Sequence, residues 1–169
     1  MSDQSTQYIF LVDDEPIQNE MLKDYLSERF KYQFKTYDSG EAAMKDIHLN
    51  PEIMVLDYHL NAHLPNAQNG VEVLRQVKAM EQSPAVIMLS GQDKLEVAVD
   101  SMKLGAYDYV VKGETAFARM ENIINNINEL KNVKAANKTY KNIMNMMIVA
   151  IVAIIAVSIF LVIKLKNWR

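Results

Sequence analysis

The stretch YIFLVDDEPIQ, residues 8–18, joins a hydrophobic run to three consecutive acids and a proline. Residues 8–12 are apolar or aromatic throughout, which is typical of a strand covered on both faces in a parallel sheet. Pro16 then suits the first turn of a helix. Neighbouring carboxylates repel one another, so three consecutive acids at 13–15 are unfavourable unless another group compensates their charge. A bound cation could do so.

Four further runs along the chain are rich in β-branched and aromatic residues, and segments with helical spacing separate them. The runs are QFKTY (33–37), IMVLD (53–57), AVIMLS (85–90) and DYVVK (108–112). This alternation predicts an α/β fold, a doubly wound five-stranded parallel sheet.

The segments between these runs carry apolar residues three or four positions apart, the spacing of one helix face. The predicted helices are one that starts at Pro16 and others within 39–49, 69–80, 93–105 and 114–133. Ser39 is a candidate cap, and Gly105 a candidate helix end. The first helix should bury Ile17, Met21, Leu22, Tyr25 and Leu26, and the last Phe117, Met120, Ile123, Ile124, Ile127 and Leu130.

Polar residues stand where four of the predicted strands end. Asp13 and Asp14 follow the first strand, Asp57 ends the third, Ser90 the fourth and Lys112 the fifth. The carboxyl ends of parallel strands meet at one edge of the sheet, so these side chains should converge. Clustered carboxylates suit Mg²⁺, and an adjacent lysine and hydroxyl suit a phosphoryl group. Asp57 is then the candidate nucleophile, because carboxylates can form aspartyl phosphates.

These residues resemble the receiver domain of two-component response regulators. The matching segments are FLVDDEP (10–16), VLDYHL (55–60), MLSG (88–91) and GAYDYVVKG (105–113), and the resemblance covers roughly residues 7–130. It implies a flavodoxin-like receiver fold and a phosphoacceptor switch. It also implies that the protein is not an enzyme beyond catalysing its own phosphorylation and dephosphorylation.

The resemblance implies a set of metal ligands around the phosphoacceptor. Asp57 would accept the phosphoryl group and, with Asp13 and Asp14, bind Mg²⁺, Asp14 directly and Asp13 mainly through water. The backbone carbonyl of His59 would complete the set. Glu15 has no necessary role and is expected in the first turn of the helix, where the helix dipole favours a carboxylate.

The resemblance also implies which residues contact the phosphoryl group. Ser90 would supply a hydroxyl and Lys112 a cation, so both would share the catalytic role with Asp57. Tyr109 would be the aromatic switch that turns inward on activation. Gly91 fits the small residue that leaves the site open to a phosphodonor.

The sequence departs from the family pattern in two loops. The family usually has a proline four residues after the phosphoacceptor and a glycine four further on, whereas the equivalents here are Pro65 and Gly70. The loop 61–70 is therefore longer. Gly113 stands where the family commonly has a cis-proline, and a non-proline cis bond costs about 3 kcal/mol, so a trans bond is expected.

Cysteine and histidine usage excludes other kinds of site. The chain has no cysteine, which excludes disulfides and thiolate metal sites. His48, His59 and His63 are scattered and lack the partners of a metal site, so we interpret them as surface or loop residues.

Two other functions remain open. A membrane-tethered interaction module would keep the receiver fold and signal without phosphorylation. The other is a metal-dependent phosphohydrolase with an aspartyl intermediate, which fits the sequence less well. Enzymes of this kind that resemble haloacid dehalogenases have a second acid two residues after the nucleophile, and this chain has His59 there. Singly, the acids could also cap a helix, and Ser90 and Lys112 could be ordinary loop and edge residues.

The charge of the chain is distributed unevenly. Residues 1–129 hold all 21 acidic residues and 11 of the 18 lysines and arginines, a net charge of −10, and the remainder holds no acid. The 22 residues at 142–163 contain no charge and no proline, and as a helix they would span about 33 Å, enough to cross a bilayer. The sequence therefore predicts a transmembrane anchor at 143–163, and the acidic body argues against nucleic-acid binding.

The predicted organisation is a polar tail (1–6), a receiver domain (7–130), a basic helical linker (131–142), the anchor and a short basic tail (164–169). The polar N-terminus is unlike a signal peptide, so the receiver should lie in the cytoplasm and the chain should cross the inner (cytoplasmic) membrane once. Expected partners are a histidine kinase or histidine phosphotransfer protein and an unidentified output protein. A homodimer is possible through the anchors, and the lack of glycine or proline from Thr115 to Ile163 favours one long helix.

Overall fold

The computed structural model describes residues 6–60, 68–91 and 95–166. By its internal contacts the chain divides into two compact units, residues 1–125 and 126–169. The first unit holds the whole β-sheet, and the second is helical.

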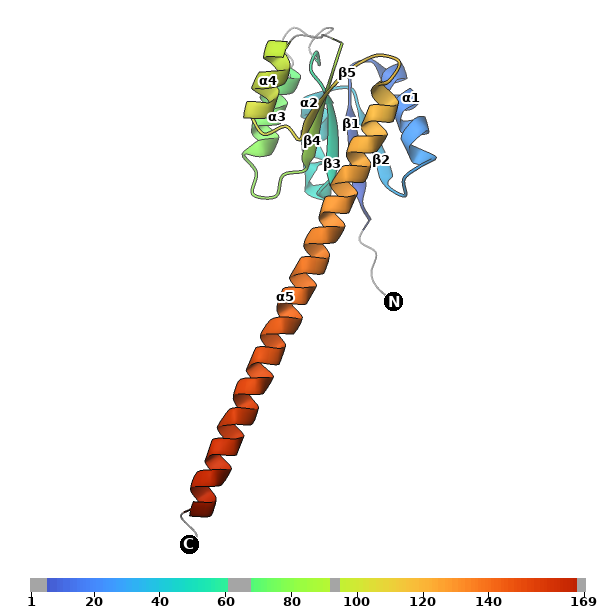
Figure 1. Cartoon of the computed structure of the whole chain (residues 1–169). Coiled ribbons are helices and arrows are strands. Elements are labelled where there is room, and N and C mark those ends of the chain that lie inside the picture. The colour runs from blue at the N-terminus through green and yellow to red at the C-terminus, as the bar shows by residue number, and fades with distance from the viewer. Residues whose placement is uncertain (1–5, 61–67, 92–94, 167–169) are drawn as a thin grey trace. The chain divides into compact units, whose positions relative to one another are not determined.

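A five-stranded parallel sheet forms the centre of the first unit (Figure 1). Its strands lie in the order β2-β1-β3-β4-β5. Their bounds are β1 (Tyr8–Val12), β2 (Gln33–Tyr37), β3 (Ile53–Asp57), β4 (Ala85–Ser90) and β5 (Asp108–Val111). The strands confirm the predicted fold, with one correction: β5 ends at Val111, so Lys112 lies just beyond its carboxyl end.

The helices alternate with the strands, as the sequence predicts. They are α1 (Pro16–Ser27), α2 (Gly40–Lys45), α3 (Gly70–Lys78), α4 (Leu95–Lys103) and α5 (Ala116–Lys166), with a 3₁₀ turn η1 (Ile47–Leu49) after α2. Gly105 has φ +93°, a left-handed conformation that suits the residue after a helix. The described peptide bonds are all trans, so the expectation of a trans bond before Gly113 is confirmed.

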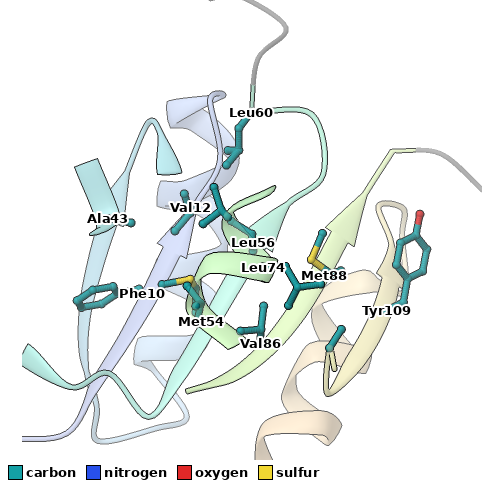
Figure 2. Packing of buried hydrophobic residues seen from close by; sticks show 13 residues of the cluster. Phe10, Val12, Ala43, Met54, Leu56, Leu60, Leu74, Val86, Met88 and Tyr109 are labelled. Carbon is teal, nitrogen blue, oxygen red and sulfur yellow. The ribbon is translucent and has the colours of Figure 1, made fainter. Parts of the chain in front are cut away.

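The hydrophobic core on one face of the sheet is built from alternate strand residues and from helices α2 and α3 (Figure 2). Phe10 and Val12 of β1 point to this face because successive strand side chains point to opposite sides. The Phe10 and Tyr37 rings meet with their centroids 4.8 Å apart. Each fully buried aliphatic or aromatic side chain stabilises the fold by about 1.5–3 kcal/mol, so this packing fixes the strand ends that carry the polar residues.

The inner face of α1 differs from the predicted one. Ile17 and Met21 are 75% and 54% exposed, whereas Leu22 and Leu26 are buried as expected. Asn19, only 5% exposed, takes the inner position, and its Nδ2 donates hydrogen bonds to the backbone oxygens of Asp13 (3.0 Å) and Tyr37 (2.9 Å). This orientation of the helix gives the Asp13 carbonyl a donor and adds a second bond to the Tyr37 carbonyl, which also accepts from the Asp13 amide at 3.1 Å.

The segment 39–49 is not one helix, in contrast to the prediction. Ser39 does occupy the N-cap position of α2, but its side chain makes no capping bond, and the helix ends at Lys45. Asp46, the next residue, accepts from Lys35 Nζ at 2.7 Å and from the Tyr37 hydroxyl at 2.9 Å. These bonds tie the chain to β2, and a separate 3₁₀ turn follows.

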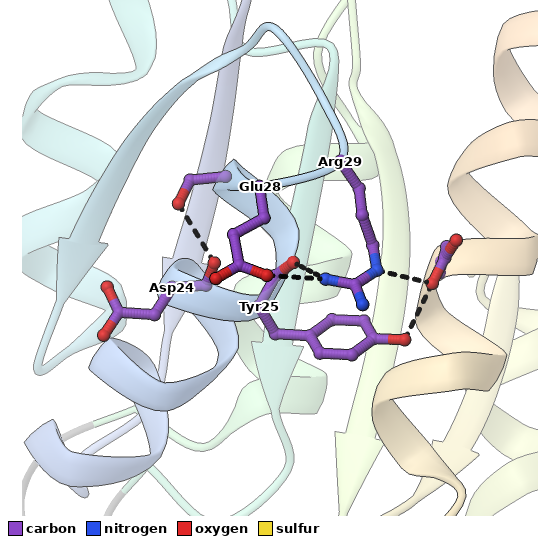
Figure 3. Close-up of polar contacts among 6 residues, drawn as sticks. Asp24, Tyr25, Glu28 and Arg29 are labelled. Atoms are coloured by element: carbon purple, nitrogen blue, oxygen red, sulfur yellow. Dashed lines mark hydrogen bonds and ion pairs between the residues drawn. The ribbon is translucent and has the colours of Figure 1, made fainter.

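The beginning of α5 is joined to α1 by a polar cluster (Figure 3). Glu121 of α5 accepts from the Tyr25 hydroxyl at 2.7 Å and pairs with Arg29 Nε at 3.1 Å. The Arg29 guanidinium lies over the Tyr25 ring at 3.8 Å, and Phe117 packs against the same ring at 5.5 Å. The hydrogen bond that the Tyr25 hydroxyl donates to Glu121, together with desolvation of the hydroxyl, raises the pKa of the Tyr25 phenol.

Replacing Glu121 by alanine should loosen this junction. Both Tyr25 and Arg29 lose their polar partner on α5, so amide hydrogen exchange within residues 116–125 should become severalfold faster. Glu129→Ala removes an exposed acid of the same helix and serves as the control. Equal exchange in the two variants would show that the Glu121 contacts do not stabilise the junction.

The second unit contains the remainder of α5, which continues without a break through residues 131–142. Within the described part of the chain, one helix is long and apolar enough to cross a membrane, and its apolar window is not buried. The expected long apolar C-terminal helix is therefore present.

Candidate functional site

Three carboxylates meet at the carboxyl edge of the sheet. One oxygen from each of Asp13, Asp14 and Asp57 lies within 4.8 Å of the others. The backbone explains the convergence, because β1 and β3 pair in parallel with Val12 opposite Leu56, and the acids follow directly. Asp13 and Asp57 are only 3% and 2% exposed, and Asp14 is half-buried.

Lys112 bridges two of these acids from the end of β5. Its Nζ lies 2.7 Å from Asp13 Oδ2 and 2.9 Å from Asp57 Oδ1. Burial disfavours the charged ammonium, but the bonds to Asp13 and Asp57 outweigh it, so the pKa of Lys112 is raised. At Asp57 burial is the larger effect, and the pKa of its carboxyl is raised although the Lys112 ammonium opposes this.

The second oxygen of each buried carboxylate is held by the backbone. The amide of His59 donates to Asp57 Oδ2 at 2.8 Å, and the amide of Glu15 donates to Asp13 Oδ1 at 2.9 Å. Glu15 is the N-cap residue of α1, one position before the first turn where the sequence placed it. Each carboxylate therefore has one oxygen fixed by the chain and one directed at Lys112.

The three acids fit a hard divalent cation. Asp14 Oδ2 is buried and has no hydrogen-bond partner among the described residues, while Asp13 Oδ2 and Asp57 Oδ1 contact only Lys112 there. Buried polar atoms are rarely left unsatisfied, and an all-oxygen donor set is what Mg²⁺ prefers.

Gly70, at the start of α3, packs against the phosphoacceptor candidate. A Cβ at Gly70 would overlap the backbone oxygen of Asp57, and the Gly70 amide donates to the Tyr58 oxygen at 3.0 Å. Asn69 and Glu72 form a reciprocal capping box that fixes the helix start. A residue without a side chain is therefore needed here.

The response regulator receiver domain model matches residues 9–128, more than two thirds of the chain. The chain belongs to this family. Receivers are the phosphoacceptor modules of two-component signalling, they bind Mg²⁺ in an acidic pocket, and they interact with histidine kinases or phosphotransfer proteins. The cluster of Asp13, Asp14 and Asp57 is an acidic group of the kind that could hold such an ion.

Individual relatives agree with this assignment. The chemotaxis protein CheY of Listeria monocytogenes is 30% identical over 105 residues, which cover 62% of this chain and 84% of the relative. The transcriptional regulatory protein MalR of Bacillus subtilis is 27% identical over 108 residues, 62% of this chain and 43% of the relative. The receiver domain of NtrX from Brucella abortus superposes with a TM-score of 0.63 at 26% identity and covers 72% of this chain and 98% of that one. The receiver thus spans less than half the length of MalR.

Ser90 lies on β4, the neighbour of the strand that ends at Asp57, and Tyr109 lies on β5, one strand further away. Ser90, fully buried, ends β4 opposite Val111, and its backbone oxygen accepts from the Lys112 amide at 2.7 Å. Tyr109 is 8% exposed and belongs to the core cluster, with its side chain drawn in Figure 2. The structure therefore brings the strand-end residues of the receiver to one edge.

The histidines are placed partly as expected. His48 is exposed, and its Nδ1 lies 3.0 Å from the Lys45 oxygen. His59 packs edge-on against Tyr58, and its Nε2 is buried without a hydrogen-bond partner in the described part of the chain. His63 and Pro65 of the longer loop lie outside the described residues.

Asn19 is the residue that the sequence reasoning missed. Its two hydrogen bonds connect the backbone of Asp13 and Tyr37 and so support the position of the acidic pair. A signal was available, because Asn19, Leu22 and Leu26 follow the three- and four-residue spacing of a single helix face.

Proposed function

We propose that this chain is a membrane-anchored receiver in which Asp57 accepts a phosphoryl group from a histidine kinase or a histidine phosphotransfer protein. The main support is the shared contact of Lys112 with the two buried carboxylates Asp13 and Asp57, in a chain of the receiver family. A half-buried lysine beside clustered acids is suited to neutralising phosphoryl oxygens.

In the proposed reaction, an Asp57 carboxylate oxygen attacks the phosphorus of a phosphohistidine. The new P–O bond forms as the P–N bond breaks, and the histidine nitrogen keeps the electron pair and takes a proton from solvent. The His59 amide orients the Asp57 carboxylate, and Lys112 and Ser90 would contact the transferred oxygens. Asp13, Asp14, Asp57 and the His59 carbonyl would hold Mg²⁺, which when bound neutralises charge on the phosphoryl group.

The proposed output is a protein contact. Phosphorylation of Asp57 would engage Ser90 and Tyr109 and alter the surface formed by α4, β5 and the beginning of α5. The burial of Tyr109 is compatible with an inward position of this switch residue. The altered surface would then bind a partner protein, a second copy of the chain, or both. Nucleic acid has no role in this proposal.

The proposed anchor is the apolar part of α5, at 143–163. Support comes from the length of this helix and from the exposure of its described apolar side chains. The receiver at 7–130 would lie on the cytoplasmic side of the inner membrane, joined by the basic linker 131–142 and followed by the basic tail 164–169.

Acetyl phosphate with Mg²⁺ should phosphorylate the full chain, as seen by a mobility shift on a phosphate-binding gel. Asp57→Asn should abolish the shift, and EDTA should prevent it in the unsubstituted protein. Asp24→Asn removes an exposed carboxylate of α1 and should leave the shift intact. An unchanged shift in Asp57→Asn, or no shift at all, would contradict the proposed acceptor and favour the unphosphorylated interaction module.

The anchor is tested separately by alkaline carbonate extraction of membranes from cells that produce the full chain. An integral helix should keep the protein in the pellet. Release into the supernatant would overturn the anchor while leaving the assignment of Asp57 untouched.

A further inference from the structure

The part of α5 that precedes the apolar run carries a single lysine face. Lys134, Lys138 and Lys141 are four and three residues apart, which is the spacing of neighbours on one side of a helix. At about 100° per residue their directions fall within about 60° of one another. All three are exposed, and the helix that contains them is continuous.

No acid neutralises this lysine face within its own unit of the structure. Glu129 is the only acidic residue in 126–169, and at about 100° per residue it points well over 90° away from each of the three lysines. The residues between the lysines are uncharged, and Lys131 continues the same face toward the N-terminus. Three cations on one face therefore form a directed positive surface.

The lysine face lies immediately before the apolar run. Lys141 is two residues from Ile143, and the three lysines cover about 10 Å of helix at about 1.5 Å per residue. The polar zone on each side of a bilayer is about 5–8 Å thick, and flexible lysine stems extend the reach of each ammonium. In an anchored chain Lys138 and Lys141 would thus stand at the depth of the lipid phosphates, and Lys134, about 14 Å of helix before Ile143, would reach that depth through its long side chain.

We infer that the face formed by Lys134, Lys138 and Lys141 binds the phosphate groups of anionic phospholipids at the membrane surface. The inference rests on the proposed anchor and goes beyond it, because an apolar helix by itself is indifferent to headgroup charge. Juxtamembrane lysines are attracted to an anionic leaflet, and phosphate is the complementary group that such a surface presents. The continuous apolar helix next to the face favours a lipid surface over a nucleic acid.

The test is amine acylation of the full chain in vesicles, with the extent of modification at each lysine read by mass spectrometry. One set of vesicles contains phosphatidylcholine alone, and the other contains phosphatidylglycerol as well. In the anionic vesicles, acylation of the three lysines should slow about fivefold, and high salt should restore it. Lys31, Lys45 and Lys103 are exposed residues of the first unit and serve as internal references.

A variant with lysines moved to another side of the helix distinguishes an effect of the lysine face from an effect of total charge. Lys134→Asn, Lys138→Ala, Asn132→Lys and Ala136→Lys together keep the net charge and move two lysines toward the opposite side of the helix. Lys141 should then lose most of its lipid-dependent protection. Undiminished protection of Lys141 would overturn the role of the face, because total charge would suffice.

The remaining outcomes distinguish this inference from the anchor. If the chain resists carbonate extraction but its lysines react equally in both vesicle types, the inference fails and the anchor stands. If carbonate removes the chain, the anchor itself fails. Protection by added RNA in detergent, without any lipid dependence in vesicles, would assign the face to a nucleic acid and also overturn the inference.

Discussion

Replacing Lys112 by methionine should lower the free energy of unfolding of the metal-free protein by about 3 kcal/mol. The ammonium lies 2.7 Å and 2.9 Å from carboxylates of Asp13 and Asp57 that are almost fully buried. Without it, two close negative charges remain in a site of low polarity. Urea unfolding of the full chain in detergent with EDTA, followed by circular dichroism, measures the loss.

If Lys112 balances the charge of the buried acids, two further results are expected for the Lys112→Met variant. Adding Asp57→Asn should restore much of the lost stability, because one of the unpaired charges disappears. Mg²⁺ should stabilise the variant more than the unsubstituted protein, since no ammonium then competes for the same oxygens. A variant as stable as the original in EDTA would show that Lys112 does not balance the buried acids.

Ionisation of Asp57 makes the free energy of unfolding depend on pH, and the direction of the pKa shift gives the direction of this dependence. Burial raises the pKa of Asp57, so the native protein holds this proton more tightly than the unfolded chain does. Ionisation of Asp57 therefore costs native stability, and this cost develops as pH rises from the ordinary aspartate pKa through the raised value. The stability deficit of Lys112→Met should accordingly be larger at neutral pH than in acid.

Replacing Gly70 by alanine should lower the free energy of unfolding by about 2 kcal/mol and slow phosphorylation of Asp57. The added Cβ would overlap the backbone oxygen of Asp57, and neither the strand end nor the capped helix start can move freely. The displacement should therefore reach the phosphoacceptor itself. The two measurements are urea unfolding and the initial rate of labelling by acetyl phosphate.

Gly113→Ala is the matched control for Gly70→Ala. No described atom lies within 4 Å of the Cβ that this change adds, so stability should change by no more than about 0.5 kcal/mol. If both alanine variants behave alike, the close approach of Gly70 to Asp57 does not constrain the site.

Strands β1, β3 and β4 were predictable because their residues are apolar on both sides, a pattern that leaves few alternatives. The meeting of Asp13, Asp14 and Asp57 was predictable too, since parallel strands end at one edge. The contact of Lys112 with two acids at once could not be predicted, because it depends on how far a side chain reaches across β4.

The misassigned elements share a physical cause. The inner face of α1 was assigned by hydrophobicity, but Asn19 occupies it and donates hydrogen bonds to the carbonyls of Asp13 and Tyr37. The helix expected over 39–49 ends early at Lys45, and the next residue, Asp46, bonds to β2. In both cases polar contacts between segments distant in sequence outweigh the local apolar pattern.

The central claim, that Asp57 is the phosphoacceptor of a membrane-embedded receiver, is tested most directly by chemical mapping. Borohydride reduces an aspartyl phosphate to homoserine, which mass spectrometry locates within a peptide. In the full chain in vesicles, treated with acetyl phosphate and Mg²⁺, homoserine should appear at position 57 while Asp13 and Asp14 stay unchanged. Homoserine at another aspartate, or none at position 57, would contradict the account.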